Sequence, residues 1–131
     1  MKHFMISLLS RFLYTKPPET KEATYPIYHL YTGPDDHSYM EKIKLPYRSK
    51  VPVQFFHLQV SPPHSTYDFH NAPQNNYVLT LCGTIEFTTS RGETFTIQKG
   101  DILWAQDVDG KGHKWVLLGE EPWIRAYISL A

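Results

Sequence analysis

The chain has one cysteine, Cys82, among its 131 residues. A single thiol cannot form a disulfide within the chain, and it cannot supply the several thiolates of a cysteine-rich zinc site. The fold must therefore be stabilised by a hydrophobic core, and a chain of this length can bury one. A lone thiol also suits a reducing compartment, so we expect a cytoplasmic protein.

The sequence also lacks an excess of charge of either sign. Thirteen Lys and Arg residues balance thirteen Asp and Glu residues, and no basic stripe runs along the chain. Proteins that bind nucleic acid use clustered positive charge to attract phosphates, so we expect no nucleic-acid partner. The composition is 41% hydrophobic and 15% aromatic, which is too apolar for a disordered chain and indicates a globular domain.

No apolar run is long enough to cross a membrane, so we expect no transmembrane segment. The first residues instead predict an amphipathic helix over 3–14, which ends before Pro17 and Pro18. Arg11 interrupts the apolar run, which disfavours a secretory signal. We expect this helix to pack on the rest of the chain or on a second subunit. Its apolar face comprises Phe4, Met5, Leu8, Leu9, Phe12 and Leu13.

Beyond the prolines the apolar pattern changes to a period of two. Ten segments alternate in this way, are rich in β-branched and aromatic residues, and are separated by Gly, Pro and Asp turns, which predicts short β-strands. No segment between them is long enough for a crossover helix, which argues against a parallel α/β sheet. The predicted strands are 26–32, 38–45, 51–60, 65–70, 76–82, 84–89, 93–98, 101–106, 113–118 and 123–130.

Three stretches of the chain resemble the motifs of cupins. Gly83, Gly92 and the turn at Gly100 have the spacing of the central strand pair of a cupin. Residues 67–74 occupy the place of the first cupin motif. Residues 106–113 resemble the ending of a group of small single-domain cupins with a D-x-x-G-K-G-H pattern.

The resemblance covers about residues 25–130. It implies an all-β fold, a cupin-type double-stranded β-helix (jelly-roll barrel), for a domain at 26–131. Residues 1–25, with the amphipathic helix and a proline-containing linker, lie outside this domain.

The metal-binding motifs of the cupin family are largely lost. Metal-binding cupins place two His, one Glu and a third His around the metal. The matching positions here hold Asp68, His70, either Asn76 or Gln74, and Leu103. Leucine has no lone pair, and a neutral amide oxygen is a poor ligand for the metals that imidazole favours, so the usual site is degraded.

A different set of residues can replace the lost ligands. His113 follows a Gly-x-Gly loop that allows its position to be adjusted. Together, Asp68, His70 and His113, with Gln74, predict a non-standard site for a divalent transition metal, iron, manganese, nickel or zinc.

The same residues allow binding or acid–base chemistry without a metal. Asp107 stands where it can orient His113 through a hydrogen bond, and such a pair can act with His70 as general acid or base. Alternation along the strand at 51–60 also makes His57 a candidate for the ligand pocket, together with Asn76.

The sequence leaves the activity open. The leading hypothesis is a cupin that binds a small organic ligand in its lumen. The alternatives are a metal-dependent oxygenase or isomerase, a metal-free epimerase or cyclase, and a non-catalytic sensor or binding subunit. Neither a nucleotide-binding loop nor a serine-hydrolase elbow is present. We further expect a homodimer, because an open sheet edge is usually covered.

Overall fold

The structure is a computed structural model, and it describes residues 23–131. These residues form ten β-strands and no helix, so no helix able to span a membrane occurs among them. The helix predicted at 3–14 lies outside the described residues. The strands are β1 (Thr24–Thr32), β2 (Ser38–Pro46), β3 (Val53–Ser61), β4 (Thr66–His70), β5 (Asn76–Cys82), β6 (Thr84–Thr89), β7 (Thr94–Gln98), β8 (Ile102–Ala105), β9 (His113–Leu118) and β10 (Trp123–Leu130).

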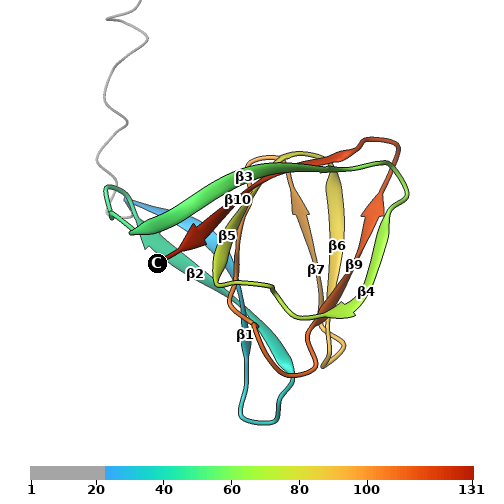
Figure 1. Cartoon of the computed structure of the whole chain (residues 1–131), viewed down its shortest axis with the longest axis horizontal. Helices are drawn as coiled ribbons and strands as arrows, with labels where there is room; N and C mark the ends of the chain where they lie inside the picture. Colours follow the sequence, from blue (N-terminus) through green and yellow to red (C-terminus); the bar gives the residue numbers. More distant parts are fainter. Residues whose placement is uncertain (1–22) are drawn as a thin grey trace, which may run out of the picture.

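The strands form two sheets (Figure 1). The larger sheet has the order β2-β1-β8-β5-β10-β3, and the smaller has the order β4-β9-β6-β7. The last eight strands pair in a nested pattern: β3 with β10, β4 with β9, β5 with β8, and β6 with β7. All four pairs are antiparallel, whereas β1 lies parallel to β8. The chain thus passes repeatedly from one sheet to the other, and the two sheets enclose the core.

The all-β prediction is confirmed, but strand pairing does not close the sheets into a barrel. Pairing in the described part of the chain stays within each sheet, which leaves β2 and β3 as the edges of one sheet and β4 and β7 as the edges of the other. Sequence alternation shows which residues face inward, but it does not show whether the outermost strands meet.

Aromatic side chains fill the space between the sheets on one side of the molecule. Along β6 the residues alternate between buried and half-buried, and Phe87 faces inward. Phe87 stacks on Phe95 with ring centroids 5.3 Å apart, and it meets the edge of Trp123 at 5.9 Å. Trp115 packs edge-on against Trp123 at 4.9 Å. Offset and edge-on pairs of this kind stabilise a core beyond the area they bury.

Strand β3 is exposed along almost its whole length. It is an edge strand, and its outer side carries Phe56, Leu58 and Val60, each more than 60% exposed. An exposed apolar edge favours association with another chain. The homodimer itself stays a prediction.

A close approach between two backbone segments positions the two histidines at the ends of β4 and β9. Gly112 has a φ of +76°, in the left-handed region, and a Cβ at this position would overlap the carbonyl oxygen of His70. Only glycine fits here, because it avoids both the overlap and the cost of a left-handed conformation. The loop before β9 can therefore lie directly against His70.

We predict that Gly112→Ala destabilises the fold more than Gly119→Ala. Gly119 has a similar φ of +72°, but a methyl group there would meet nothing within 4 Å, so its substitution carries only the backbone strain of about 1–2 kcal/mol. Gly112→Ala adds the overlap with His70. Urea unfolding of both variants measures the two losses, and equal losses would show that the close approach is absent.

Candidate functional site

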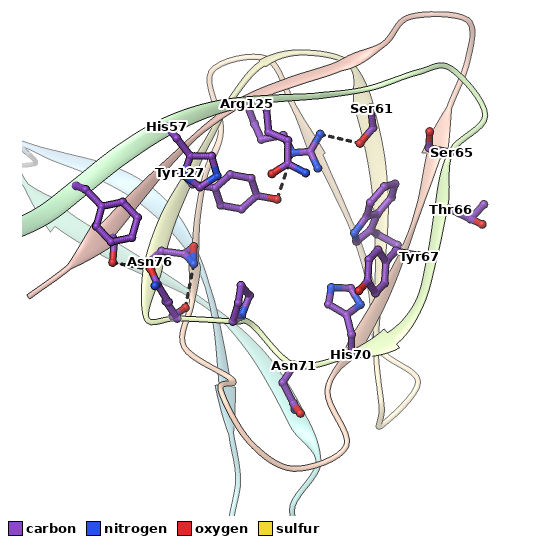
Figure 2. A pocket seen from close by; sticks show the side chains of 16 residues that line it. His57, Ser61, Ser65, Thr66, Tyr67, His70, Asn71, Asn76, Arg125 and Tyr127 are labelled. Carbon is purple, nitrogen blue, oxygen red and sulfur yellow. Dashed lines mark hydrogen bonds between the residues drawn. The ribbon is translucent and has the colours of Figure 1, made fainter.

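A cavity of about 590 Å³ lies between the two sheets. Strands β3 and β10 form one wall, and β4, the segment after it and β9 form the other. Figure 2 shows Arg125 and Tyr127 on one side of the cavity, and Tyr67 and His70 on the opposite side. The lining residues are Phe55, His57, Gln59, Ser61, Ser65, Thr66, Tyr67, His70, Asn71, Pro73, Gln74, Asn76, Trp115, Arg125, Tyr127 and Ser129.

The imidazole of His70, the last residue of β4, has a defined orientation and tautomer. Its Nδ1 lies 2.7 Å from the backbone carbonyl oxygen of Asp68. A carbonyl oxygen only accepts hydrogen bonds, so Nδ1 carries the proton and donates it. In the neutral ring Nε2 then keeps its lone pair. His70 lines the large cavity and also a smaller inner cavity of about 40 Å³.

His113, the first residue of β9, lies beside His70 and lines the inner cavity. The two ring centroids are 4.6 Å apart. His113 is 4% exposed, and its Nδ1–H donates to Oδ2 of the fully buried Asp107 at 2.5 Å. The hydroxyl of Ser38 donates to the same oxygen at 2.6 Å. This buried hydrogen-bonded set fixes the His113 ring with its Nε2 directed away from Asp107.

The two imidazoles together can accept a proton or a hydrogen bond at Nε2. Each uses Nδ1 as a donor to a protein oxygen, and no protein partner for either Nε2 is found among residues 23–131. Asp107 occupies the orienting position that the sequence predicted for it. A carboxylate behind an imidazole holds the orientation and the tautomer of the ring, which is an arrangement suited to general acid–base chemistry.

Burial of the His70 ring in the cavity wall lowers its pKa from the ordinary imidazole value. The hydrogen bond to the carbonyl of Asp68 opposes this shift, the neighbouring His113 adds to it, and the charge of Asp107 opposes it. The net effect favours neutral His70, the form whose Nε2 can act as an acceptor.

Of the other residues predicted from the sequence, three line the cavity and one does not. His57 stacks on Tyr127 at 5.1 Å, and the side-chain oxygen of Gln74 accepts a hydrogen bond from Ser129 at 2.8 Å. Asn76 lies where the two cavities adjoin. Asp68 lies outside both linings, and its carboxylate accepts a hydrogen bond from the backbone N–H of Phe69.

The described residues do not fit the predicted metal site. No group of three His, Cys, Asp or Glu side chains able to hold a metal ion is found in the range 23–131. His70 and His113 converge, but Asp68 lies outside the linings of both cavities and Gln74 is bonded to Ser129. Alternation placed Asp68 and His70 on one face, but the β4–β9 pairing shifts register between Tyr67 and His70, and this shift breaks the alternation.

A group of cavity residues on β10 and on β3 beside it was not predicted from the sequence. Arg125 and Tyr127 share the inward face of β10 with Trp123, and Ser61 lies opposite Trp123 on β3. The position of Arg125 between Trp123 and Tyr127 could have indicated this group from the sequence. A charged residue rarely stands at an inward position of an apolar strand without a specific partner.

Comparison with known proteins gives little further information. No family model matches the chain, and no curated protein matches it. A solved structure with some likeness is that of protein NMB1881 from Neisseria meningitidis, which is 14% identical over 95% of this chain and 96% of that chain, with a TM-score of 0.42. At this level of similarity we transfer neither fold nor function.

We predict that His70 makes stability depend on pH in the acidic range. The pKa of His70 is lower in the folded protein than in the unfolded chain. The contribution of His70 to the free energy of unfolding is therefore fully present above about pH 6.5, the ordinary imidazole pKa, and is lost as the pH falls through the pKa of the folded state. The measurement is the free energy of unfolding in urea at pH 7.5 and pH 5.0. We expect a smaller loss in His70→Gln than in the unsubstituted protein, and equal losses would contradict the shift.

We also predict that the purified protein retains no stoichiometric transition metal at this site. The reason is the donor set, which offers two imidazoles but no third ligand side chain in the described residues. Elemental analysis after dialysis against buffered iron, manganese, nickel and zinc salts measures this. Bound metal at one equivalent that disappears in both His70→Ala and His113→Ala would overturn the prediction and restore the metal hypothesis.

Proposed function

We propose that the chain is a cupin-type protein that binds a small organic ligand in the cavity between its sheets, next to His70 and His113. The observation that carries this proposal is a cavity of about 590 Å³ in which a polar side-chain set and an acceptor imidazole converge. Cavities of 300–1,000 Å³ are the usual size for small-molecule sites. Both aromatic and hydroxyl side chains line it, as in such sites.

The order of the strands supports the cupin-type part of the proposal. Strands β3 to β10 pair as a nested series, first with last and inward to β6 with β7. A long antiparallel hairpin folded over two sheets has this order, and eight strands in two sheets are the jelly-roll arrangement that cupins use. Strands β1 and β2 extend one sheet beyond these eight.

The side chains that line the cavity on β3 and β10 favour a bound ligand over a filled core. Core positions near the cavity are aromatic and close-packed, whereas the cavity lining on β3 and β10 carries Gln59, Ser61 and Ser129. Polar side chains that face the cavity provide hydrogen bonds to a bound molecule. A ligand in that space reaches His70 directly and approaches the inner cavity beside His113.

We predict that a large side chain at Gln59 blocks ligand binding and that the same change at Gln54 does not. Both glutamines are exposed on β3, but only Gln59 lines the cavity. The probes are three monocarboxylic acids, benzoate, phenylacetate and hexanoate, and their primary amides. Binding is measured by chemical-shift changes in the NMR spectrum.

We expect at least one probe to shift the signals of His70 and to bind at least about tenfold more weakly to Gln59→Trp. Gln54→Trp, the matched control, should bind like the unsubstituted protein. Absence of binding by all six probes, or equal weakening in both variants, would contradict the proposed function.

A further inference from the structure

Arg125 is a buried positive charge in the cavity wall without a negative partner. The residue is 2% exposed, yet it lies in no ion pair with an Asp or Glu of the described chain. No acidic side chain from residues 23–131 lines the cavity. The guanidinium stacks on Trp123 at 3.9 Å, which holds it in place but does not neutralise it. Buried charges are normally paired, so this one calls for an anion from outside the described residues.

The hydrogen bonds of Arg125 leave part of the guanidinium available. Nε donates to the hydroxyl oxygen of Tyr127 at 3.2 Å, and Nη1 donates to Ser61 Oγ at 2.8 Å and to the carbonyl of Trp123 at 3.2 Å. Arginine has five N–H groups, so the two on Nη2 remain without a partner in residues 23–131. These bonds fix the plane of the guanidinium (Figure 2).

The two hydroxyls beside Arg125 add further donors. Tyr127 and Ser61 each accept a hydrogen bond from the guanidinium, so the O–H of each is free to donate elsewhere. Neither hydroxyl donates to another group in the described structure. Two N–H groups of the guanidinium and the O–H groups of its two hydroxyl partners therefore lie in one part of the cavity wall, and none has an acceptor among residues 23–131.

We infer that this cluster, Arg125 with Tyr127 and Ser61, is a subsite for the carboxylate of the ligand. A carboxylate supplies two acceptor oxygens in the geometry that a guanidinium matches. One guanidinium balances one negative charge, so a monocarboxylate is favoured over a dianion such as a phosphate monoester. The inference rests on the proposed function, because it names the chemical class of the molecule held in the same cavity.

The subsite also sets the direction of the ligand. Arg125 lies across the cavity from His70 (Figure 2), and Trp115 and Phe55 provide apolar wall area. A bound monocarboxylate would place its charge at Arg125 and its apolar body along these rings. Its far end would then face His70, whose Nε2 accepts a hydrogen bond or a proton.

The test compares each acid with its own amide, since the two share a shape and differ in charge. Benzoate, phenylacetate and hexanoate are titrated against benzamide, phenylacetamide and hexanamide at constant ionic strength, with NMR shifts as the readout. We expect at least one acid to bind at least about tenfold more tightly than its amide. In Arg125→Met this ratio should fall to about one, and in Tyr127→Phe it should fall part of the way.

Arg91→Met is the control, because it removes an exposed positive charge outside the cavity lining and should leave the ratio unchanged. If Arg125→Met does not fold, the acid-to-amide affinity ratios of the unsubstituted protein and of Tyr127→Phe test the carboxylate subsite. Amides that bind as tightly as acids would overturn the carboxylate subsite and leave the binding function intact. Failure of all six probes to bind would overturn both.

Discussion

The buried hydrogen bond from His113 to Asp107 is the interaction on which the site depends. It joins the start of β9 to the loop before it, and the hydroxyl of Ser38 attaches β2 to the same carboxylate oxygen. Burying a carboxylate costs free energy unless it is hydrogen-bonded. Ser38 and His113 must therefore stay within hydrogen-bond distance of Asp107 in the folded protein. Gly112 then brings the loop against the backbone of His70. The two imidazoles are adjacent for this reason, although they lie far apart in the sequence.

The packing between the sheets explains why a cavity exists at all. On one side the stacked and edge-on rings of Phe87, Trp115 and Trp123 fill the interior. On the other side β3 is exposed and carries polar residues toward the inside, so the same two sheets enclose a space instead of a core. Arg125 lies at this boundary, stacked on the core indole of Trp123 and facing the cavity. Core and site therefore share residues, and changes in either are expected to affect both.

The strands could be predicted well from the sequence because their alternation is strong, and all but β1 and β3 have the predicted bounds to within one residue. His70, His113 and Asp107 were predicted to act together, from motif positions and from the Gly-x-Gly loop before His113, and the three lie together in the structure. Asp68 lies outside both cavity linings, and the shift of register between β4 and β9 that separates it from His70 cannot be seen in a single strand. Arg125 was missed, because its partner Ser61 becomes a neighbour only when β3 pairs with β10. Cross-strand register, more than residue type, determines which side chains meet.

At the centre of the site, both imidazoles carry their proton on Nδ1 and present an unprotonated Nε2. Long-range ¹H–¹⁵N NMR correlation of the histidine rings at neutral pH tests this most directly, because protonated and unprotonated ring nitrogens differ widely in ¹⁵N shift. We expect a protonated Nδ1 and an unprotonated Nε2 for both His70 and His113. An unprotonated Nδ1 with the proton on Nε2 in either ring would contradict this, because Nδ1 could then not donate to Asp107 or to the Asp68 carbonyl.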